Sequence, residues 1–98
     1  MSRIYHVYLM TNFTNTVIYI GVTNNLMRRV FEHKHKANPY SFSAQYNLKK
    51  LVYYEEFDDI GYAIAREKQL KGGSRRKKEL LIQIENPDYD DLSQDWYD

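Results

Sequence analysis

The hydrophobic pattern is clearest near the start of the chain, where it predicts two short strands. Residues 5–11 (YHVYLMT) and 16–22 (TVIYIGV) alternate side chains with the period of two that places successive residues on opposite faces of a sheet. Residues 12–15 (NFTN) lie between them and are mostly of the types that hydrogen-bond their own backbone in turns. The pattern therefore predicts a β-hairpin with a four-residue loop.

In that hairpin Thr11 pairs with Thr16, and the register brings Tyr8 opposite Tyr19 on one face of the sheet. The other face is almost wholly apolar, and we expect it to be the core side. Its residues are Tyr5, Val7, Leu9, Ile18, Ile20 and Val22. The two phenols therefore meet on the less apolar face, next to Gly21. They form either an aromatic pair that steadies the sheet or part of a functional site.

The rest of the chain predicts one more strand and three helices. A helix is predicted over residues 26–36, which follow a good start signal and precede Asn38-Pro39, where the residue before proline disfavours the α conformation. Residues 51–57 predict a third strand, and residues 60–71 and 75–85 predict two further helices. The order β-β-α-β-α-α indicates the α+β fold class, as a single small domain with a three-stranded antiparallel sheet flanked by about three helices.

Composition narrows the class of protein. With 98 residues, 43% hydrophobic and 28% charged, the chain is expected to form one globular domain. It contains no cysteine, which excludes disulfides and thiolate metal ligands. No apolar run approaches the ~20 residues of a membrane span, and the N-terminus lacks a signal-peptide core. We therefore expect a cytoplasmic protein with no membrane partner, and its oligomeric state is left open.

The small net charge of +1 hides a strong asymmetry. Residues 1–84 hold all 14 Lys and Arg but only seven of the 13 acids, whereas residues 85–98 hold six acids and no base. A basic body of this kind suits a polyanionic partner such as DNA. We expect a folded domain over residues 1–86 and an acidic C-terminal tail over residues 87–98. A solvated tail is the expected arrangement, and a tail that lies over the basic face or anchors a partner is the alternative.

Arg29 and His33 are four residues apart in the first predicted helix and therefore share a face. On a helical wheel His33 falls beside the apolar stripe that contains Leu26 and Val30, with Arg29 at its edge. A partly buried histidine beside a surface arginine is the simpler interpretation. The functional interpretation is a guanidinium that binds a phosphate and an imidazole that moves a proton.

Glu67 is the most unusual residue of the second predicted helix, because it falls on an apolar stripe. The other members of that stripe are Ile60, Ala63, Ile64 and Leu70. A carboxylate in such a place has to be paired, hydrogen-bonded or bound to a metal. Mg²⁺ and Mn²⁺ favour carboxylate ligands together with water and phosphate oxygens, so a metal is one explanation. An ion pair with Arg29 is the other, and both stay open at this point.

Residues 66–78 (REKQLKGGSRRKK) contain seven bases and one acid. A solvated surface is the ordinary interpretation of such a run. The run also crosses the start of the third predicted helix, where several cations can meet a phosphate backbone in a sequence-independent and salt-sensitive way. The candidates for that contact are Lys71, Arg75, Arg76, Lys77 and Lys78.

Taken together, these residues resemble the GIY-YIG nuclease superfamily over about residues 4–86. The resemblance rests on Tyr8, on the triplet Tyr19-Ile20-Gly21, on Arg29 and His33, and on Glu67 in AIAREKQLKGGSRRKKELL. It is closest to the small stand-alone bacterial branch of excinuclease-like, single-domain endonucleases. The YIG triplet alone is a weak signal, whereas the whole set in this order is a strong one.

The resemblance implies a divalent-metal-dependent endonuclease that hydrolyses phosphodiester bonds in DNA, with DNA repair or recombination as its setting. By position, Tyr8 and Tyr19 are the motif tyrosines, Arg29 is the helix arginine, and Glu67 is the single ligand of Mg²⁺ or Mn²⁺. His33 falls where members of the family have a histidine or tyrosine. One tyrosine, with its pKa lowered by nearby cations, would accept a proton from the attacking water. Which tyrosine does so is not decided by the sequence.

The chain departs from the family pattern at three places. His6 replaces the first glycine of the GIY triplet, Val22 follows the YIG triplet where some members have lysine, and no asparagine follows Glu67 before Asn86. These departures motivate an alternative function, a nucleic-acid-binding module that keeps the nuclease fold without strong catalysis. A third hypothesis is a protein-interaction domain that uses the acidic tail, with Trp96 and Tyr97 as anchors.

Overall fold

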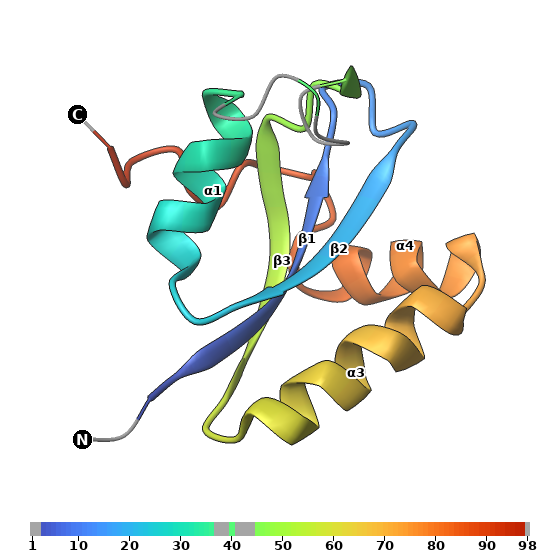
Figure 1. The fold of residues 1–98 in the computed structure, drawn as a ribbon. Coiled ribbons are helices and arrows are strands. Elements are labelled where there is room, and N and C mark those ends of the chain that lie inside the picture. The colour runs from blue at the N-terminus through green and yellow to red at the C-terminus, as the bar shows by residue number, and fades with distance from the viewer. Residues whose placement is uncertain (1–2, 37–39, 41–44, 98) are drawn as a thin grey trace.

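The computed structural model describes residues 3–36, residue 40 and residues 45–97. Its elements follow the predicted order β-β-α-β-α-α (Figure 1). The strands are β1 (Tyr5–Thr11), β2 (Ile18–Thr23) and β3 (Lys50–Phe57), and the helices are α1 (Leu26–Lys34), α3 (Ile60–Gly72) and α4 (Arg75–Glu85). The strands form one antiparallel sheet with the order β2-β1-β3, so the predicted α+β fold class is confirmed.

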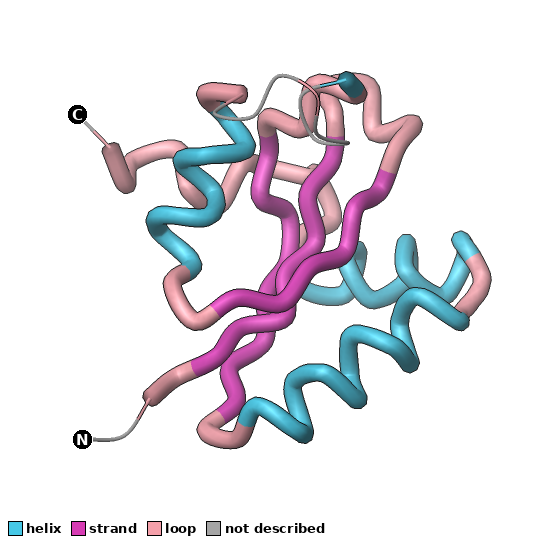
Figure 2. The backbone as a smooth tube through the Cα atoms, in the orientation of Figure 1, coloured by secondary structure: helices cyan, strands magenta, loops and turns pink. Residues whose placement is uncertain are grey.

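Helices cover both faces of the sheet, with α1 on one side and α3 and α4 on the other (Figures 1 and 2). Each face has a core of its own. The core beneath α3 and α4 contains Val7, Leu9, Ile20, Val52, Tyr53, Ala63 and Ile82. The core beneath α1 contains Tyr8, Met10, Leu26, Val30, Leu48 and Leu51. The expectation of a single core face is therefore wrong, because α1 and the C-terminal segment bury the tyrosine face as well.

The hairpin register differs from the predicted one by two residues. Tyr8 lies opposite Gly21 rather than opposite Tyr19, because the loop spans residues 12–17 rather than 12–15. A shift of two residues preserves the alternation of side chains between the faces. Tyr8 and Tyr19 therefore still share one face, as predicted.

The side chain of Asn12 explains the longer loop. Its Oδ1 accepts hydrogen bonds from the backbone N–H groups of Thr16 (2.9 Å) and Val17 (3.1 Å), and its Nδ2 donates to the Thr16 hydroxyl (2.7 Å). These backbone groups are thereby held inside the loop, and regular pairing begins at Ile18. A side chain that acts as a backbone mimic is common in turns, but the hydrophobic pattern does not reveal it.

The helix α1 begins after Asn25, whose side chain accepts a hydrogen bond from the Arg28 N–H (3.2 Å). The helix ends at Lys34, two residues earlier than predicted, and Lys36 adopts a left-handed backbone conformation (φ 51°). The predicted stop at Asn38-Pro39 lies outside the described residues. Within the described part of the chain, no helix has the length and apolar content needed to cross a bilayer.

The apolar stripe predicted for α3 is only partly confirmed. Ala63 is fully buried and Leu70 packs against the core, but Ile60 and Ile64 are exposed. The helix lies along the twisted sheet at an angle, as Figure 1 shows, so its two ends do not bury the same stripe. Burial is concentrated around Ala63 and toward the helix C-terminus.

The C-terminal segment, residues 87–97, packs against β3 and α1 rather than extending into solvent. The Asp91 Oδ1 accepts a hydrogen bond from the Leu51 N–H (3.0 Å), and the Leu92 N–H donates to the Leu51 carbonyl (2.8 Å). The Asp91 Oδ2 also forms an ion pair with Lys34 (2.5 Å). The expectation of a solvated tail is wrong, because an acid within the segment has a basic partner on α1. The domain boundary placed at residue 86 stays a prediction.

Candidate active site

Tyr8 lies at the centre of the candidate site, on β1 and beneath α1. Its side chain is almost completely buried, and its hydroxyl lies 2.8 Å from Nε2 of His33. His33 is also buried, so the interpretation of a buried histidine with a hydrogen-bond partner is confirmed. A Cβ added to Gly21 would lie 2.5 Å from the Tyr8 hydroxyl oxygen. The small residue on β2 therefore provides the space for the phenol.

Tyr19 completes a group of three rings. Its ring centroid lies 6.1 Å from that of Tyr8 and 5.2 Å from that of His33, and the Tyr8 and His33 centroids are 5.7 Å apart. Tyr19 is half-buried, whereas Tyr8 and His33 are buried. The structure thus brings together three of the residues predicted from the sequence, Tyr8, Tyr19 and His33. Of these, Tyr19 is the one with access to solvent.

Burial sets the protonation states in this group. It lowers the pKa of His33 to about 4; the Arg29 charge acts in the same direction, and Glu32 opposes it. Burial also raises the pKa of Tyr8, helped by Tyr19, although hydrogen bonding and charge from Arg29 act against this rise. At neutral pH the imidazole is therefore neutral and the phenol protonated, and the imidazole tautomer decides which of the two donates in the hydrogen bond between the Tyr8 hydroxyl and Nε2 of His33. The expected lowering of the tyrosine pKa is wrong for Tyr8, because desolvation outweighs the nearby cation.

Arg29 lies at the open side of this group. Its Nη1 donates to the Glu32 Oε1 at 3.2 Å, and the side chain remains 46% exposed. The pKa of Arg29 is raised, chiefly by its contact with Tyr8, and the pKa of Glu32 is lowered, chiefly by Arg29. The guanidinium is therefore a fixed positive charge that contacts the buried phenol while part of it faces solvent.

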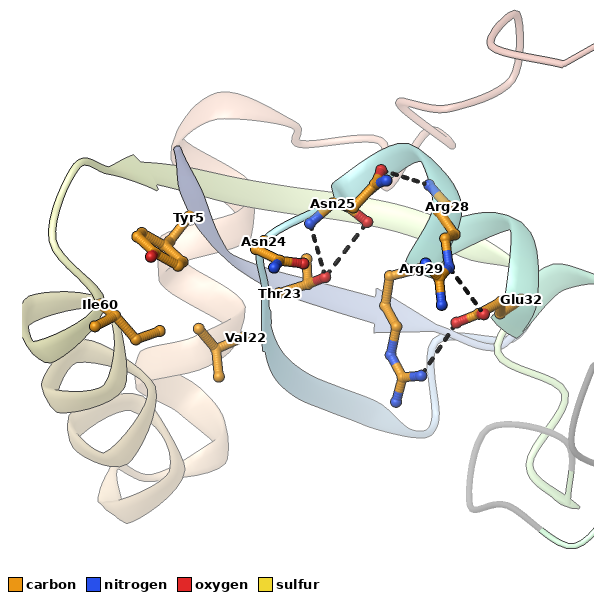
Figure 3. A pocket seen from close by; sticks show the side chains of 9 residues that line it. All are labelled: Tyr5, Val22, Thr23, Asn24, Asn25, Arg28, Arg29, Glu32 and Ile60. Carbon is orange, nitrogen blue, oxygen red and sulfur yellow. Dashed lines mark hydrogen bonds and ion pairs between the residues drawn. The ribbon is translucent and has the colours of Figure 1, made fainter. Parts of the chain in front are cut away.

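A pocket of about 410 Å³ opens beside Arg29, between the start of α1, the end of β2 and the start of α3 (Figure 3). Arg28, Arg29 and Glu32 form one wall, and Asn24 and Asn25 lie next to them. Figure 3 shows the Arg29 side chain extending away from α1, toward β2. Two guanidinium groups and two amides in an open pocket are chemically suited to phosphate.

Glu67 lies on α3, the helix that packs against the other face of the sheet. Its side chain is 17% exposed, and its Oε1 forms an ion pair with the Lys71 Nζ at 3.4 Å. The alternative of an ion pair with Arg29 does not occur among the described residues, where Arg29 pairs with Glu32. The carboxylate is thus partly buried, and on α3 it lies apart from the group of Tyr8, Tyr19 and His33 beneath α1, so its role as a metal ligand stays a prediction.

The residues around Glu67 fit a metal ion that needs one protein ligand, and they do not fit one that needs several. The described residues contain no group of three or more His, Asp and Glu that would enclose a metal. Zinc, which takes three or four protein ligands, does not fit this arrangement. A single, partly buried carboxylate does fit Mg²⁺ or Mn²⁺, which complete their coordination with water and phosphate oxygens.

The basic segment lies where α3 meets α4, and its cations differ in their contacts. Arg75 is tied to the hairpin loop, because its guanidinium donates to the carbonyls of Thr16 (2.7 Å) and Asn15 (2.6 Å). Lys71 pairs with Glu67. Arg76 and Lys77 are exposed, and Lys78 is half-buried. The structure therefore gives Arg75 a structural contact in addition to its predicted role.

Sequence reasoning missed Glu32, which holds the guanidinium of Arg29. The signal was present, because Glu32 follows Arg28 by four residues and Arg29 by three, and such pairs meet on a helix. It gave no role to Asn86, the first asparagine after Glu67. Asn86 caps α4 and donates to the Val52 carbonyl (3.1 Å), which is a structural role.

Comparisons with known proteins agree with this geometry. A family model described as the GIY-YIG catalytic domain matches residues 4–80, a range that contains all five residues of the candidate site. A UPF0213 protein of Natronomonas pharaonis is 34% identical, over 84% of this chain and 94% of its own length. A UPF0213 protein of Limosilactobacillus reuteri is 33% identical, over 83% and 84%. The solution NMR structure of a UPF0213 protein of Bacillus halodurans has the same fold, with a TM-score of 0.57, 24% identity, and coverage of 94% and 97%.

Proposed function

This chain belongs to the GIY-YIG catalytic-domain family, and from that premise we propose that it is a metal-dependent endonuclease that hydrolyses phosphodiester bonds in DNA. The observation that carries the proposal is the contact of Tyr8, Tyr19 and His33 with one another beside the Arg29 guanidinium. It brings two phenols and a neutral imidazole beside Arg29, a fixed cation that also lines an open pocket. DNA repair or recombination as its setting, and the cytoplasm as its location, stay predictions from the sequence.

Arg29 is the proposed ligand of the scissile phosphate. A guanidinium offers a planar fork of donors that matches phosphate oxygens, and its charge persists at every relevant pH. Glu32 holds this fork from one side at 3.2 Å and leaves the side chain partly exposed. Arg29 would therefore stabilise the charge that develops on the phosphate in the transition state.

Tyr19 is the proposed acceptor of the proton from the attacking water. Tyr8 is a weaker candidate, because it is 1% exposed, burial raises the pKa of its phenol, and its hydroxyl is held 2.8 Å from Nε2 of His33. Tyr19 is half-buried and its ring contacts both of these residues. Tyr8 and His33 would then act as positioning residues for Tyr19 and Arg29.

Glu67 is the proposed ligand of one Mg²⁺ or Mn²⁺. When bound, such an ion supplies Lewis-acid stabilisation of the phosphate and of the leaving oxygen. Glu67 would release its ion pair with Lys71 to hold the ion. The cations at the junction of α3 and α4 would contact the DNA backbone, and Arg76 and Lys77 are exposed members of this set.

A second candidate function is binding of nucleic acid without cleavage. It is supported by the raised pKa of Tyr8 and by Val22, an apolar residue at the place where some family members have lysine. The first feature keeps Tyr8 from serving as a base, and the second leaves the site without a lysine that would favour an ionised phenol, while neither affects the cationic surfaces. This function predicts salt-dependent binding of DNA that no divalent cation converts into cleavage.

The test is a cleavage assay over nicked, branched and supercoiled DNA with Mg²⁺ or Mn²⁺. Metal-dependent cleavage by the intact chain, abolished in Glu67→Gln and in Tyr19→Phe, would support the nuclease. Glu79→Gln is the matched control, since Glu79 is another helix acid paired with a base one turn away, and it should cleave normally. Cleavage that survives in Glu67→Gln would contradict the metal site, and binding without cleavage would favour the second function.

A further inference from the structure

A second hollow lies on the α1 face of the sheet and is not used by the proposed mechanism. It has a volume of about 480 Å³, within the range of ligand pockets, which is roughly 300–1,000 Å³. It lies between the start of β1, the middle of β3, the start of α1 and the C-terminal segment. We call it the aromatic groove after three of its lining residues, His6, Tyr54 and Trp96.

The three rings of the aromatic groove form an open aromatic surface. The His6 and Tyr54 centroids are 5.8 Å apart at 69°, and the Tyr54 and Trp96 centroids are 6.3 Å apart at 68°. These are edge-to-face contacts, in which the edge of one ring meets the face of its neighbour. They cover less of the ring faces than a parallel stack would. Tyr54 is 38% exposed and Trp96 is half-buried. Aromatic surfaces of this kind bind unpaired nucleobases by stacking.

The polar groups of the groove match the edge of a base. His6 lines the groove, and its buried Nδ1 has no hydrogen-bond partner among the described residues, at a cost of roughly 1–3 kcal/mol that a shift of the ring toward a bound base would relieve. The His6 Nε2 lies 3.5 Å from the Glu56 carboxylate, which is 65% exposed. The amides of Asn24 and Asn25 line the same hollow. Amide and carboxylate groups are among those that recognise base edges, and an imidazole nitrogen can donate or accept in the same way.

The aromatic groove differs in charge from the pocket beside Arg29. Among its described lining residues there is one acid and no lysine or arginine, so it is not suited to a phosphate. The neighbouring pocket contains Arg28 and Arg29, and the two hollows share Asn24 and Asn25 as a common wall. A nucleotide strand can therefore place a phosphate at Arg29 and a base in the aromatic groove, on either side of this wall.

From this arrangement we propose that the aromatic groove receives an unpaired base of the nucleic acid whose phosphate lies at Arg29. The position of that phosphate rests on the function proposed above. A base that stacks in the groove cannot remain in a duplex, so the preferred substrate is single-stranded or splayed rather than fully paired DNA. The groove thereby selects the substrate structure.

Trp96 allows this proposal to be tested without cleavage, because it is the only tryptophan of the chain. The intact protein is titrated in EDTA with a short single-stranded DNA, with its duplex, and with an oligonucleotide of equal length and charge that has abasic sites. We expect saturable quenching of Trp96 fluorescence by the single strand alone, and an affinity about tenfold higher than that of the abasic strand. Equal affinities with unchanged fluorescence would overturn the proposal.

Two substitutions localise the effect. Tyr54→Ala should weaken binding of the single strand about tenfold and leave the weak duplex binding unchanged. Tyr62→Ala is the matched control, since Tyr62 is a 71% exposed tyrosine on α3, and it should bind normally. Equal weakening in both variants would contradict the groove. Quenching without metal-dependent cleavage would support the groove and reject the nuclease, whereas cleavage with no preference for unpaired bases would do the reverse.

Discussion

The phenol ring of Tyr8 fills the space that a side chain at position 21 would occupy. A Cβ on Gly21 would lie 2.5 Å from the Tyr8 hydroxyl oxygen and 2.6 Å from Cζ, across a directly paired position of β1 and β2. Gly21 does not have a positive φ, so its backbone tolerates other residues and only the contact with Tyr8 requires glycine. The glycine of the YIG triplet thus has a steric role in placing a tyrosine on the neighbouring strand.

Gly21→Ala should therefore destabilise the protein by about 2 kcal/mol, since the buried ring has no room to yield. Urea denaturation measures this change. Gly72→Ala is the control, because nothing lies within 4 Å of a Cβ there and alanine favours the helix. It should leave the free energy of unfolding unchanged or raise it slightly. Equal stability of the two variants would show that Tyr8 moves aside at little cost.

Stability should fall as the pH is lowered from about 6.5 to about 4, because His33 resists protonation in the folded state. In that window the unfolded chain binds a proton at residue 33 and the folded chain does not. Proton binding therefore stabilises the unfolded state and lowers the free energy of unfolding. Above the window both states are neutral, and below it both are protonated. A shift from 6.5 to about 4 corresponds to a loss on the order of 3 kcal/mol.

The measurement is the free energy of unfolding against pH, compared with that of His33→Gln. The groups that face His33 are Tyr8 on β1, Tyr19 on β2, and Arg29 and Glu32 on α1. All of these are unchanged in the variant, so the difference between the two curves isolates the imidazole. His35→Gln, at an exposed position just after α1, should keep the slope. An identical slope in His33→Gln would contradict the prediction.

Arg29→Lys should lower the cleavage rate about a hundredfold, since an ammonium cannot reproduce the fork that contacts both Tyr8 and a phosphate. Arg28→Lys is the matched control. Arg28 also pairs with Glu32, but its side chain is 75% exposed. It should retain most of the activity. Similar losses in both variants would indicate a general effect of charge in the pocket rather than a specific contact.

Arg76→Ala should weaken DNA binding and reduce the slope of log affinity against log salt by about one. The physical reason is the loss of one exposed cation that releases a counterion on binding. Arg75→Ala is not an equivalent test, because Arg75 also holds the carbonyls of Asn15 and Thr16 and its loss loosens the hairpin loop. An unchanged salt slope in Arg76→Ala would remove this residue from the DNA interface.

Asp91→Ala should destabilise the protein by about 3 kcal/mol. The carboxylate accepts from the backbone of Leu51 and from the hydroxyl of Ser93, and it pairs with the largely buried Lys34. Its loss leaves a buried ammonium without its charge partner. Asp95→Ala, at an exposed acid of the same segment, should change the stability by less than about 0.5 kcal/mol. Urea denaturation of both variants measures these changes, and equal stability of Asp91→Ala and Asp95→Ala would contradict the prediction.

The periodic pattern was sufficient to predict the three strands and the helices α1, α3 and α4, because each of them buries apolar side chains. It was not sufficient for the hairpin register, which depends on three hydrogen bonds of the Asn12 side chain. The second core was missed because Tyr8 counts as a polar-tipped residue in an alternation, although its ring is buried. At the site, helical spacing alone brought Arg29 and His33 together, whereas their contact with Tyr8 depends on how α1 packs on the sheet.

The position of the acidic C-terminal segment differs most from the prediction, because the segment packs against β3 and α1 rather than extending into solvent. Its composition is that of a solvated chain, and only tertiary contacts reveal its place. Asp91 forms an ion pair with Lys34, which is 57 positions away in the sequence. The hydroxyl of Tyr97 donates to the carbonyl of Met27 at 2.5 Å. No local rule of spacing connects such partners.

This segment also has a consequence for association between molecules. β3 is an edge strand in the order β2-β1-β3, and an uncovered edge is a template on which other chains add strands and aggregate. Leu51 on this edge gives its N–H to Asp91 and its carbonyl to the Leu92 N–H. The acidic segment thus occupies the backbone N–H and carbonyl of Leu51 at this edge and places negative charge beside them. Both effects disfavour the addition of a strand from another molecule.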